Sequence, residues 1–271
     1  MKPTALNQLI IAIKGAGEMA SAIAWRLFSA HCHHIFMMEV DKPLAVRREV
    51  SFCEAVYEGH KTVEDVEALR VRDDGELQGA WTNKKIAVMV DPHWRILKRI
   101  RPDVVVDAIL AKKNLGTHLA EADLVIGLGP GFTAGKDVHM VIETNRGHNL
   151  GRIITTGGAE PNTGIPGSIG GQGIKRVLWA PAKGVFKALR SIGDLVKSGE
   201  VIGSVGGKEI RAQIDGALRG LIRTGTHVPS GLKLGDIDPR AQRQFCYTIS
   251  DKARAVSGSV LEAILRIYNP H

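Results

Sequence analysis

Short runs of mainly apolar residues recur along the first half of the chain. They lie at residues 9–14, 34–40, 85–90, 104–109 and 123–127. Strands that are buried on both faces of a parallel sheet are apolar throughout rather than alternating, so these runs predict five parallel strands. The segment after the first run, GAGEMASAIAWRLFSA, has apolar residues at helical spacing and predicts a β-α-β unit. We therefore expect residues 1–172 to form an α/β domain with a Rossmann-like, doubly wound, mostly parallel sheet.

The pattern changes near residue 173 to short β-type runs that are punctuated by glycine. Residues 173–245 are therefore expected to form a small all-β module. Two of its segments, APAKGVFKALRSIGDLVKSGEVIG and AQIDGALRGLIRTGTHVPSGLKLG, are similar and predict two quasi-symmetric halves of a flattened barrel. Residues 246–271 are expected to form a helical segment that packs on the first domain, with an amphipathic helix at 257–268.

A glycine-rich stretch at residues 155–173 joins these two patterns and shows no periodicity. It is either a simple connector between domains or a binding loop. Asn162 and Thr163 favour the second interpretation, because a turn there offers both an amide and a hydroxyl group to a ligand. Both interpretations stay open at this point.

Composition narrows the class of partner. The chain has 271 residues, with 44% hydrophobic and 24% charged residues and a formal net charge of +8. The positive charge favours an anionic partner, but the basic residues are dispersed and aromatic content is only 5%. We therefore expect a small anionic ligand rather than nucleic acid. Three separated cysteines and the lack of a long apolar segment predict a cytoplasmic protein with no membrane span.

The sequence GAGEMA matches the GxGxxA pattern of dinucleotide-binding turns, between a predicted strand and a predicted helix. In such a turn Gly15 permits the tight bend and Gly17 lets a pyrophosphate approach the backbone. Glu39, at the end of the next predicted strand, is placed to accept hydrogen bonds from ribose hydroxyls. Glu18 adds a carboxylate at the helix start, where it interacts favourably with the helix dipole but would repel a phosphate. NAD(P) or another nucleotide is the expected cofactor, and the alternative is a Rossmann-like fold whose site is empty or binds something else.

A second group of candidate residues follows the last apolar run. Asp137, His139 and Glu143 are spaced so that an extended strand would turn all three to one face. Together with His148 they predict either a general acid/base group or a divalent-metal site, although the four residues match no recognised metal motif. We expect acid/base chemistry and leave metal binding open. Gly129 and Gly131 leave backbone uncovered for an anion.

Basic residues elsewhere add to this candidate site. Lys112, with Lys113 and Arg146, could balance the charge of an anion beside the acid/base group. The alternative is that all of these polar residues are solvated at a sheet end.

Several segments together resemble a known family. They are GAGEMASAIAWRL, DKPLAVRREVSFCEAVYEG, DAILAKKN, GLGPGFTAGKDVHMVIETNRGHNLGRII, PNTGIPG and LRGLIRTGTHVPSGLKLGDIDPR. They are similar to the accessory, or maturation, family of selenium-dependent molybdenum hydroxylases, whose members are called YqeB-like. The resemblance implies a cytoplasmic maturation protein, an apo-hydroxylase of the xanthine dehydrogenase-like kind as partner, and the molybdenum cofactor or a selenium species as cargo.

The β module resembles the barrel-sandwich hybrid of biotinyl and lipoyl carrier domains. Lys208 lies in GGKEI, eight residues before Gly216, and lacks the flanking methionines of those carriers. Covalent biotin or lipoate is therefore not expected.

Three classes of function remain after the sequence. The first is a nucleotide-binding maturation factor, the second an NAD(P)-dependent oxidoreductase, and the third a non-catalytic interaction scaffold. Whether a reaction is catalysed stays open, because no Tyr-Lys or His-Asp pair at a known spacing follows the GxGxxA turn. Assembly into a homo-oligomer also stays open.

Overall fold

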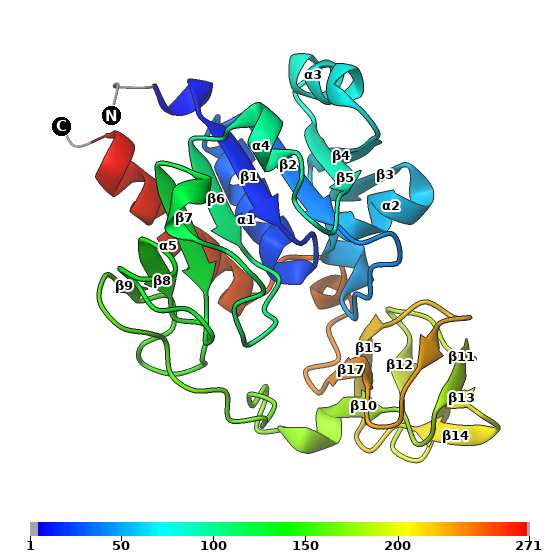
Figure 1. The fold of residues 1–271 in the computed structure, drawn as a ribbon. Helices are drawn as coiled ribbons and strands as arrows, with labels where there is room; N and C mark the ends of the chain where they lie inside the picture. Colours follow the sequence, from blue (N-terminus) through cyan, green and yellow to red (C-terminus); the bar gives the residue numbers. More distant parts are fainter. Residues whose placement is uncertain (1–4, 270–271) are drawn as a thin grey trace. The chain divides into compact units, whose positions relative to one another are not determined.

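The computed structural model describes residues 5–269, which fall into two compact units (Figure 1). Within these residues, unit 1 comprises 5–43, Ser51–Asn162 and 249–269. Unit 2 comprises Leu44–Val50 and Thr163–Thr248.

Unit 1 is built on a nine-stranded sheet with the order β3-β4-β5-β2-β1-β6-β7-β8-β9. Its strands are β1 (Ile10–Lys14), β2 (His34–Glu39), β3 (His60–Val63), β4 (Val66–Val71), β5 (Ile86–Val90), β6 (Val104–Asp107), β7 (Leu124–Leu128), β8 (Met140–Ile142) and β9 (Ile153–Ile154). All neighbours from β4 to β8 are parallel, and β3 and β9 add antiparallel edges. The five expected strands are confirmed as parallel members of this sheet.

The sheet grows in both directions from β1. Strand β2 pairs with one side of β1, and the next strand on the other side is β6. The carboxyl ends of β1 and β6 therefore lie where the strand order reverses, which is the position where open α/β sheets bind ligands.

Helices of unit 1 cover this sheet. They are α1 (Glu18–Ser29), α2 (Ala55–Glu58), α3 (Asp74–Thr82), α4 (Leu97–Ile100) and α5 (Asp251–Tyr268). Helix α5 packs along α1, where the Arg26 guanidinium donates to Arg254 O and Ser257 Oγ. It begins six residues before the expected start at 257, because Ser250 caps it and accepts from the Ala253 N–H. Short 3-10 helices lie at Leu6–Gln8, Arg48–Val50, Phe52–Glu54, Leu119–Glu121, Ile174–Arg176 and Arg243–Cys246.

Unit 2 consists of two four-stranded antiparallel sheets. One has the order β10-β17-β15-β12 and the other the order β14-β13-β11-β16. The strands are β10 (Val177–Trp179), β11 (Gly184–Ala188), β12 (Leu195–Val196), β13 (Val201–Val205), β14 (Lys208–Arg211), β15 (Gly216–Leu221), β16 (His227–Val228) and β17 (Lys233–Asp238). A buried apolar cluster that includes Phe186, Ile202, Leu218 and Leu234 fills the space between them.

The two similar segments each contribute strands to both sheets of unit 2. The first repeat contributes β11, β12 and β13, and the second contributes β15, β16 and β17. The short middle strand of each repeat pairs with the first strand of the other, β12 with β15 and β16 with β11. The similar sequences thus occupy equivalent positions in the two sheets.

The observed unit boundaries differ from residues 1–172, 173–245 and 246–271 at three places. Unit 2 includes residues 163–172, residues 246–248 and, from the amino-terminal half, Leu44–Val50. The Arg47 guanidinium donates to Phe245 O and Thr248 O, each at 2.9 Å, and Arg48 Nε donates to Leu221 O at 2.7 Å. A Cβ on Gly220 would lie 2.8 Å from Val46, so backbone also packs closely here. These contacts between distant residues attach the short segment to the β unit.

Candidate functional site

The glycine turn after β1 contains two glycines with different roles. Gly15 has φ +87°, and a Cβ on it would lie 3.3 Å from Ile109 Cα in the loop after β6. Its backbone therefore requires glycine. Gly17 is the N-cap of α1 with φ −73° and ψ −172°, an ordinary extended conformation, and a Cβ on it would have no atom within 4 Å. Neither the conformation nor the packing of the described residues explains a glycine at position 17.

Glu39 closes the same turn. Its Oε2 accepts from the Ala16 N–H and its Oε1 from the Val40 N–H, both at 2.8 Å. Burial raises the pKa of this carboxyl, while the two backbone hydrogen bonds act in the opposite direction. A carboxylate has about four lone-pair sites, so Glu39 keeps acceptor capacity for a ribose hydroxyl while it orders the turn.

Glu18 begins α1, and its Oε1 accepts from Ser250 Oγ at 2.9 Å. This hydrogen bond joins the first turn of α1 to the N-cap of α5. The carboxylate that was expected to oppose a phosphate is thus held by a neighbouring hydroxyl.

A buried charged network lies beneath the turn, and the sequence analysis did not anticipate it. Lys14 is fully buried, and its Nζ donates to Thr117 Oγ1 at 2.7 Å and to Glu121 Oε1 at 2.8 Å. Thr117 Oγ1 in turn donates to Asp107 Oδ2 at 2.6 Å. The Lys14 ammonium also lies 3.6 Å from the centroid of the Trp94 ring. The signal for this network was a charged residue at the end of two apolar strands, LIIAIK and VVVD.

Burial shifts both strand-end residues towards their neutral forms. It lowers the pKa of Lys14, against the raising effect of Glu121, and it raises the pKa of the Asp107 carboxyl. The network is therefore a set of ionisable groups at the carboxyl ends of β1 and β6, with Lys14 enclosed by protein atoms rather than open to a ligand.

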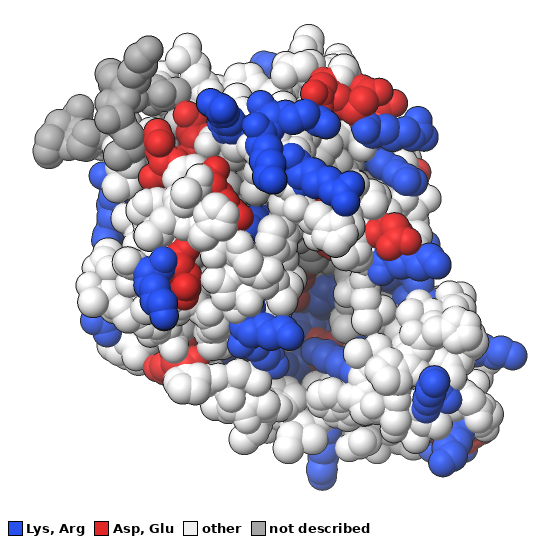
Figure 2. All heavy atoms as spheres, viewed as in Figure 1, with Lys and Arg blue, Asp and Glu red and all other residues white. Residues whose placement is uncertain are grey.

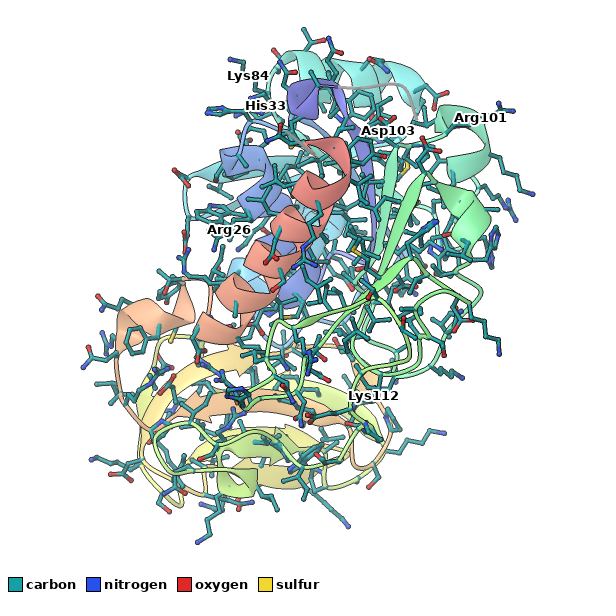
Figure 3. All side chains as sticks on the ribbon, turned by 90° about the vertical axis from the view of Figure 1, so that its left-hand side faces the viewer. Arg26, His33, Lys84, Arg101, Asp103 and Lys112 are labelled. Carbon is teal, nitrogen blue, oxygen red and sulfur yellow. The ribbon has the colours of Figure 1, made fainter. Side chains whose placement is uncertain are left out.

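The loop after β6 lies against the loop after β7. Leu110 and Lys112 both have positive φ, +60° and +62°, which is unusual for residues other than glycine. A Cβ on Gly131 would lie 2.6 Å from Lys113 Cα, so this glycine permits the two backbones to touch. Lys112 and Lys113 are exposed on the same loop. Figure 3 shows Lys112 at the opposite end of the sheet from Lys84, Arg101 and Asp103.

Gly129 also has a packing role. Its φ is +71°, and a Cβ on it would lie 2.4 Å from Thr144 Oγ1 in the loop after β8. Contact between loops thus accounts for Gly129 and Gly131, which we expected to expose backbone to an anion.

The acid/base group has a different arrangement from the one expected. Strand β8 contains only Met140–Ile142, so Asp137 and His139 precede it. The Asp137 carboxylate accepts from the Thr133 N–H at 2.9 Å and closes a turn. Glu143 is buried and accepts from the N–H groups of Asn145 and Glu160, each at 2.7 Å. Hydrogen bonding to backbone N–H groups therefore fixes these carboxylates separately, and the extended strand that would align them does not form.

His139 also bonds to the backbone. The imidazole Nδ1 of His139 accepts from the Val125 N–H at 2.9 Å, and the backbone N–H of His139 donates to Val125 O at 2.8 Å. The backbone bond continues the pairing of β7 with β8 by one residue, and the imidazole adds a second bond to Val125. Among the described residues, no group of three or more His, Cys, Asp or Glu side chains could hold a metal ion.

The hydrogen bond from the Val125 N–H to His139 Nδ1 predicts that the stability of the protein depends on pH. Burial lowers the pKa of His139, with a smaller raising effect from Asp123, so the folded protein favours the neutral imidazole. Its contribution to stability is present above the unfolded-state value of about 6.5 and is lost as the pH falls towards the lower folded-state value. In His139→Asn the amide oxygen replaces Nδ1 without titrating. We expect denaturation between pH 7 and 5 to show a smaller loss of stability in this variant, and parallel curves would contradict the assignment.

Asn162 and Thr163 are exposed, and Thr163 Oγ1 accepts from the Ile165 N–H at 3.2 Å. They lie at the boundary between the two units, Asn162 in unit 1 and Thr163 in unit 2.

Arg146 forms a bidentate ion pair with Asp251, and both N···O distances are 2.7 Å.

On the face that Figure 2 shows, Lys and Arg side chains form several separate groups, with Asp and Glu side chains among them. The last part of α4 and the residue that follows it carry three exposed basic side chains, those of Lys98, Arg99 and Arg101. No helix among residues 5–269 combines the length and the apolar character that a membrane crossing needs.

A comparison with known proteins gives a relative for nearly the whole chain. The chain is 48% identical over 269 residues to the uncharacterised protein YqeB of Escherichia coli (strain K12). The alignment covers 98% of this chain and 49% of YqeB, so the chain spans about half the length of the curated relative it matches. This match supports a YqeB-like family for the chain. No family model matches it.

Solved structures give weaker similarities. An aspartoacylase family protein from Mesorhizobium loti is 15% identical, with a TM-score of 0.24 over 50% of this chain and 56% of that protein. The ectoine utilization protein EutE (DoeB) from Ruegeria pomeroyi, in its apo form, is 11% identical, with a TM-score of 0.25 over 84% of this chain and 85% of that protein. These scores are too low to support an argument about fold or function.

Proposed function

We propose that unit 1 is a Rossmann-like, doubly wound domain that binds a small anionic ligand of the nucleotide type at the turn after β1. The observation that carries this proposal is Gly17. A glycine that neither backbone conformation nor packing requires, at the N-cap of α1, leaves room for a ligand to approach the helix N-terminus.

The surroundings of Gly17 support the same ligand class. The N-terminus of the 12-residue helix α1 carries partial positive charge, which favours a phosphate. Lys112 and Lys113 add two exposed ammonium groups on the loop after β6, whose backbone touches the glycine turn at Ile109. Glu39 lies at the end of β2, where an acidic side chain accepts from ribose hydroxyls in dinucleotide-binding domains.

We further propose that the protein is a maturation factor for selenium-dependent molybdenum hydroxylases. The family resemblance of the quoted segments supports this role, and the match to YqeB supports the family. The partner would be a xanthine dehydrogenase-like apo-enzyme, and the cargo the molybdenum cofactor or a selenium species. The nucleotide site would then bind a nucleotide-type ligand during transfer of this cargo to the apo-enzyme. We expect the transfer to take place in the cytoplasm.

Gly17→Ser gives a sharp test of the ligand site. Serine is at least as good an N-cap as glycine and its Cβ meets no neighbour, so the variant should unfold at the same temperature as the parent or slightly above it. Its hydroxymethyl group occupies the space that a pyrophosphate needs, so affinity should fall by about tenfold or more. A thermal-shift titration with NAD, NADP, FAD, ATP, GTP, CTP and molybdopterin nucleotides measures both quantities.

The control is Gly258→Ser, a change at a glycine inside α5 whose Cβ also meets no atom within 4 Å. It should leave ligand binding unchanged. If no nucleotide stabilises the parent protein, or if Gly17→Ser binds as well as the parent, the nucleotide site is wrong.

The maturation role has its own test. Apo-hydroxylase should gain activity when incubated with cofactor in the presence of this protein, and Gly17→Ser should activate it less. Unchanged activation without physical association would contradict the role. An NAD(P)-dependent oxidoreductase would instead change the absorbance of reduced nicotinamide with a substrate. A non-catalytic scaffold would bind the hydroxylase equally well with serine at position 17.

A further inference from the structure

A pocket of about 550 Å³ lies in unit 1 between helices α2 and α3 and the strand β4. Figure 1 shows these elements at one edge of the unit 1 sheet. Its lining includes the charged residues Glu58, Arg70, Arg72 and Glu76 and the buried apolar residues Val71 and Ala80. This volume lies in the range of small-molecule sites in proteins. None of these residues belongs to the glycine turn.

Gly79 also lines this pocket and has no structural explanation within the described residues. It lies in the interior of α3, where glycine is destabilising relative to alanine. Its φ is not positive, and a Cβ on it would have no atom within 4 Å. The helix therefore has no packing contact that excludes alanine, and the missing side chain enlarges the pocket.

Hydrogen bonds at its start hold the helix that carries Gly79, and they do not involve Gly79 itself. Asp73 caps it and accepts from the Glu76 N–H at 2.9 Å, and Glu76 Oε2 accepts from the Arg72 N–H at 2.7 Å. Asp73 is the N-cap of α3 and Glu76 bonds to the residue before it, so both hydrogen bonds fix the start of the helix. Substitutions at position 79, in the second turn, should therefore leave the helix in place.

The charges of the pocket indicate the class of ligand. Arg72 pairs with Glu76, with Nη1 and Oε1 3.5 Å apart. Arg70 is held by a neutral group instead, because its Nη1 donates to Val56 O at 2.8 Å. Among residues 5–269 the Arg70 guanidinium makes no ion pair. A guanidinium has five N–H donors in a planar fork, so Arg70 retains donors with the geometry that a carboxylate matches.

We propose that this pocket binds a small organic carboxylate. The carboxylate would pair with Arg70, and the carbon chain would lie over Gly79 and the apolar surface of Val71 and Ala80. Two arginines and two glutamates give the four charged lining residues no net charge, which favours a carboxylate over a more highly charged phosphate. This site goes beyond the proposed nucleotide site and does not depend on it.

The test follows the backbone amide signals of Gly79 and Asn83 in the full chain by NMR. Succinate, glutarate and glutamate are titrated to about 10 mM, with inorganic phosphate as the competing anion. At least one carboxylate should shift both signals in a saturable way, and phosphate should bind more weakly. Absence of saturable shifts with every carboxylate, or equal binding of phosphate, would overturn the proposal.

Variants locate the ligand. Gly79→Ala should raise the melting temperature and weaken carboxylate binding, and Gly79→Leu should abolish it by filling the pocket. Gln78→Leu is the matched control, because Gln78 is exposed on the same helix and does not line the pocket. Arg70→Met should weaken binding by about tenfold or more, through loss of the fork. Parent-like affinity in Gly79→Leu or in Arg70→Met would contradict the site, whereas Gly17→Ser should leave carboxylate binding intact.

Discussion

Lys14→Met is expected to lower the free energy of unfolding by about 3–5 kcal/mol, the effect of removing one partner from a buried ion pair. Methionine is an unbranched side chain one atom shorter than lysine, so it fills most of the same space and removes the charge. Glu121 and Asp107 would then remain in the protein interior without the cation that bonds directly to the first and, through Thr117, to the second. Denaturant unfolding monitored by tryptophan fluorescence measures the loss, and Trp94 beside Lys14 reports on the site itself.

Glu121 provides the control for this prediction. In the double variant Lys14→Met with Glu121→Met, the uncompensated carboxylate is gone, so part of the lost stability should return. A loss below about 1 kcal/mol for Lys14→Met alone would show that the network contributes little more than an exposed ion pair.

Asp236→Ala should have an effect of similar size in unit 2. Asp236 is 1% exposed and pairs with two buried guanidiniums, those of Arg176 and Arg219, the second through Nε at 2.8 Å. Removing this carboxylate leaves both cations without their main partner, and we expect a loss of about 3–5 kcal/mol. Asp238 lies 3.3 Å from Arg219 Nη1 and compensates in part, which favours the lower end of that range.

Two measurements test this second prediction. Circular dichroism at increasing denaturant gives the stability, and limited proteolysis should cut within 163–248 first. Asp215→Ala is the control, because the Lys197–Asp215 pair has side chains that are 83% and 60% exposed, and solvent screens such a pair. The interpretation would fail if Asp236→Ala were no less stable than Asp215→Ala.

Much of the fold could be predicted from local sequence. The five apolar runs correspond to parallel strands of one sheet, because a strand buried on both faces carries apolar side chains at every position. The glycine turn lies between β1 and α1, since Gly15 requires a positive φ that glycine adopts easily. The repeated segments form equivalent strands in unit 2, since similar patterns bury similar faces.

Other features escaped the sequence analysis. The β3–β4 hairpin was not predicted. Strand β3 lies at the edge of the sheet, where His60 is exposed and Val63 is buried, so its residues are a mixture of polar and apolar types like those of a loop. Asp137, His139 and Glu143 share a strand-like spacing, but each side chain bonds to a different backbone N–H group, those of Thr133, Val125 and Glu160. Spacing along the chain describes only side chains that follow one regular backbone, and this segment changes conformation within seven residues.

The sequence by itself determined the order and type of the main strands, the turn at Gly15 and the two-fold repeat of the β unit. These features depend on neighbours within a few residues, where apolar periodicity and glycine conformation act. Only the tertiary structure decided that Lys14 pairs with Glu121, that residues 44–50 join the β unit, and that Gly17 and Gly79 have open space before them. Each of these depends on contacts, or on their absence among residues 5–269, between segments that the chain brings together only when it folds.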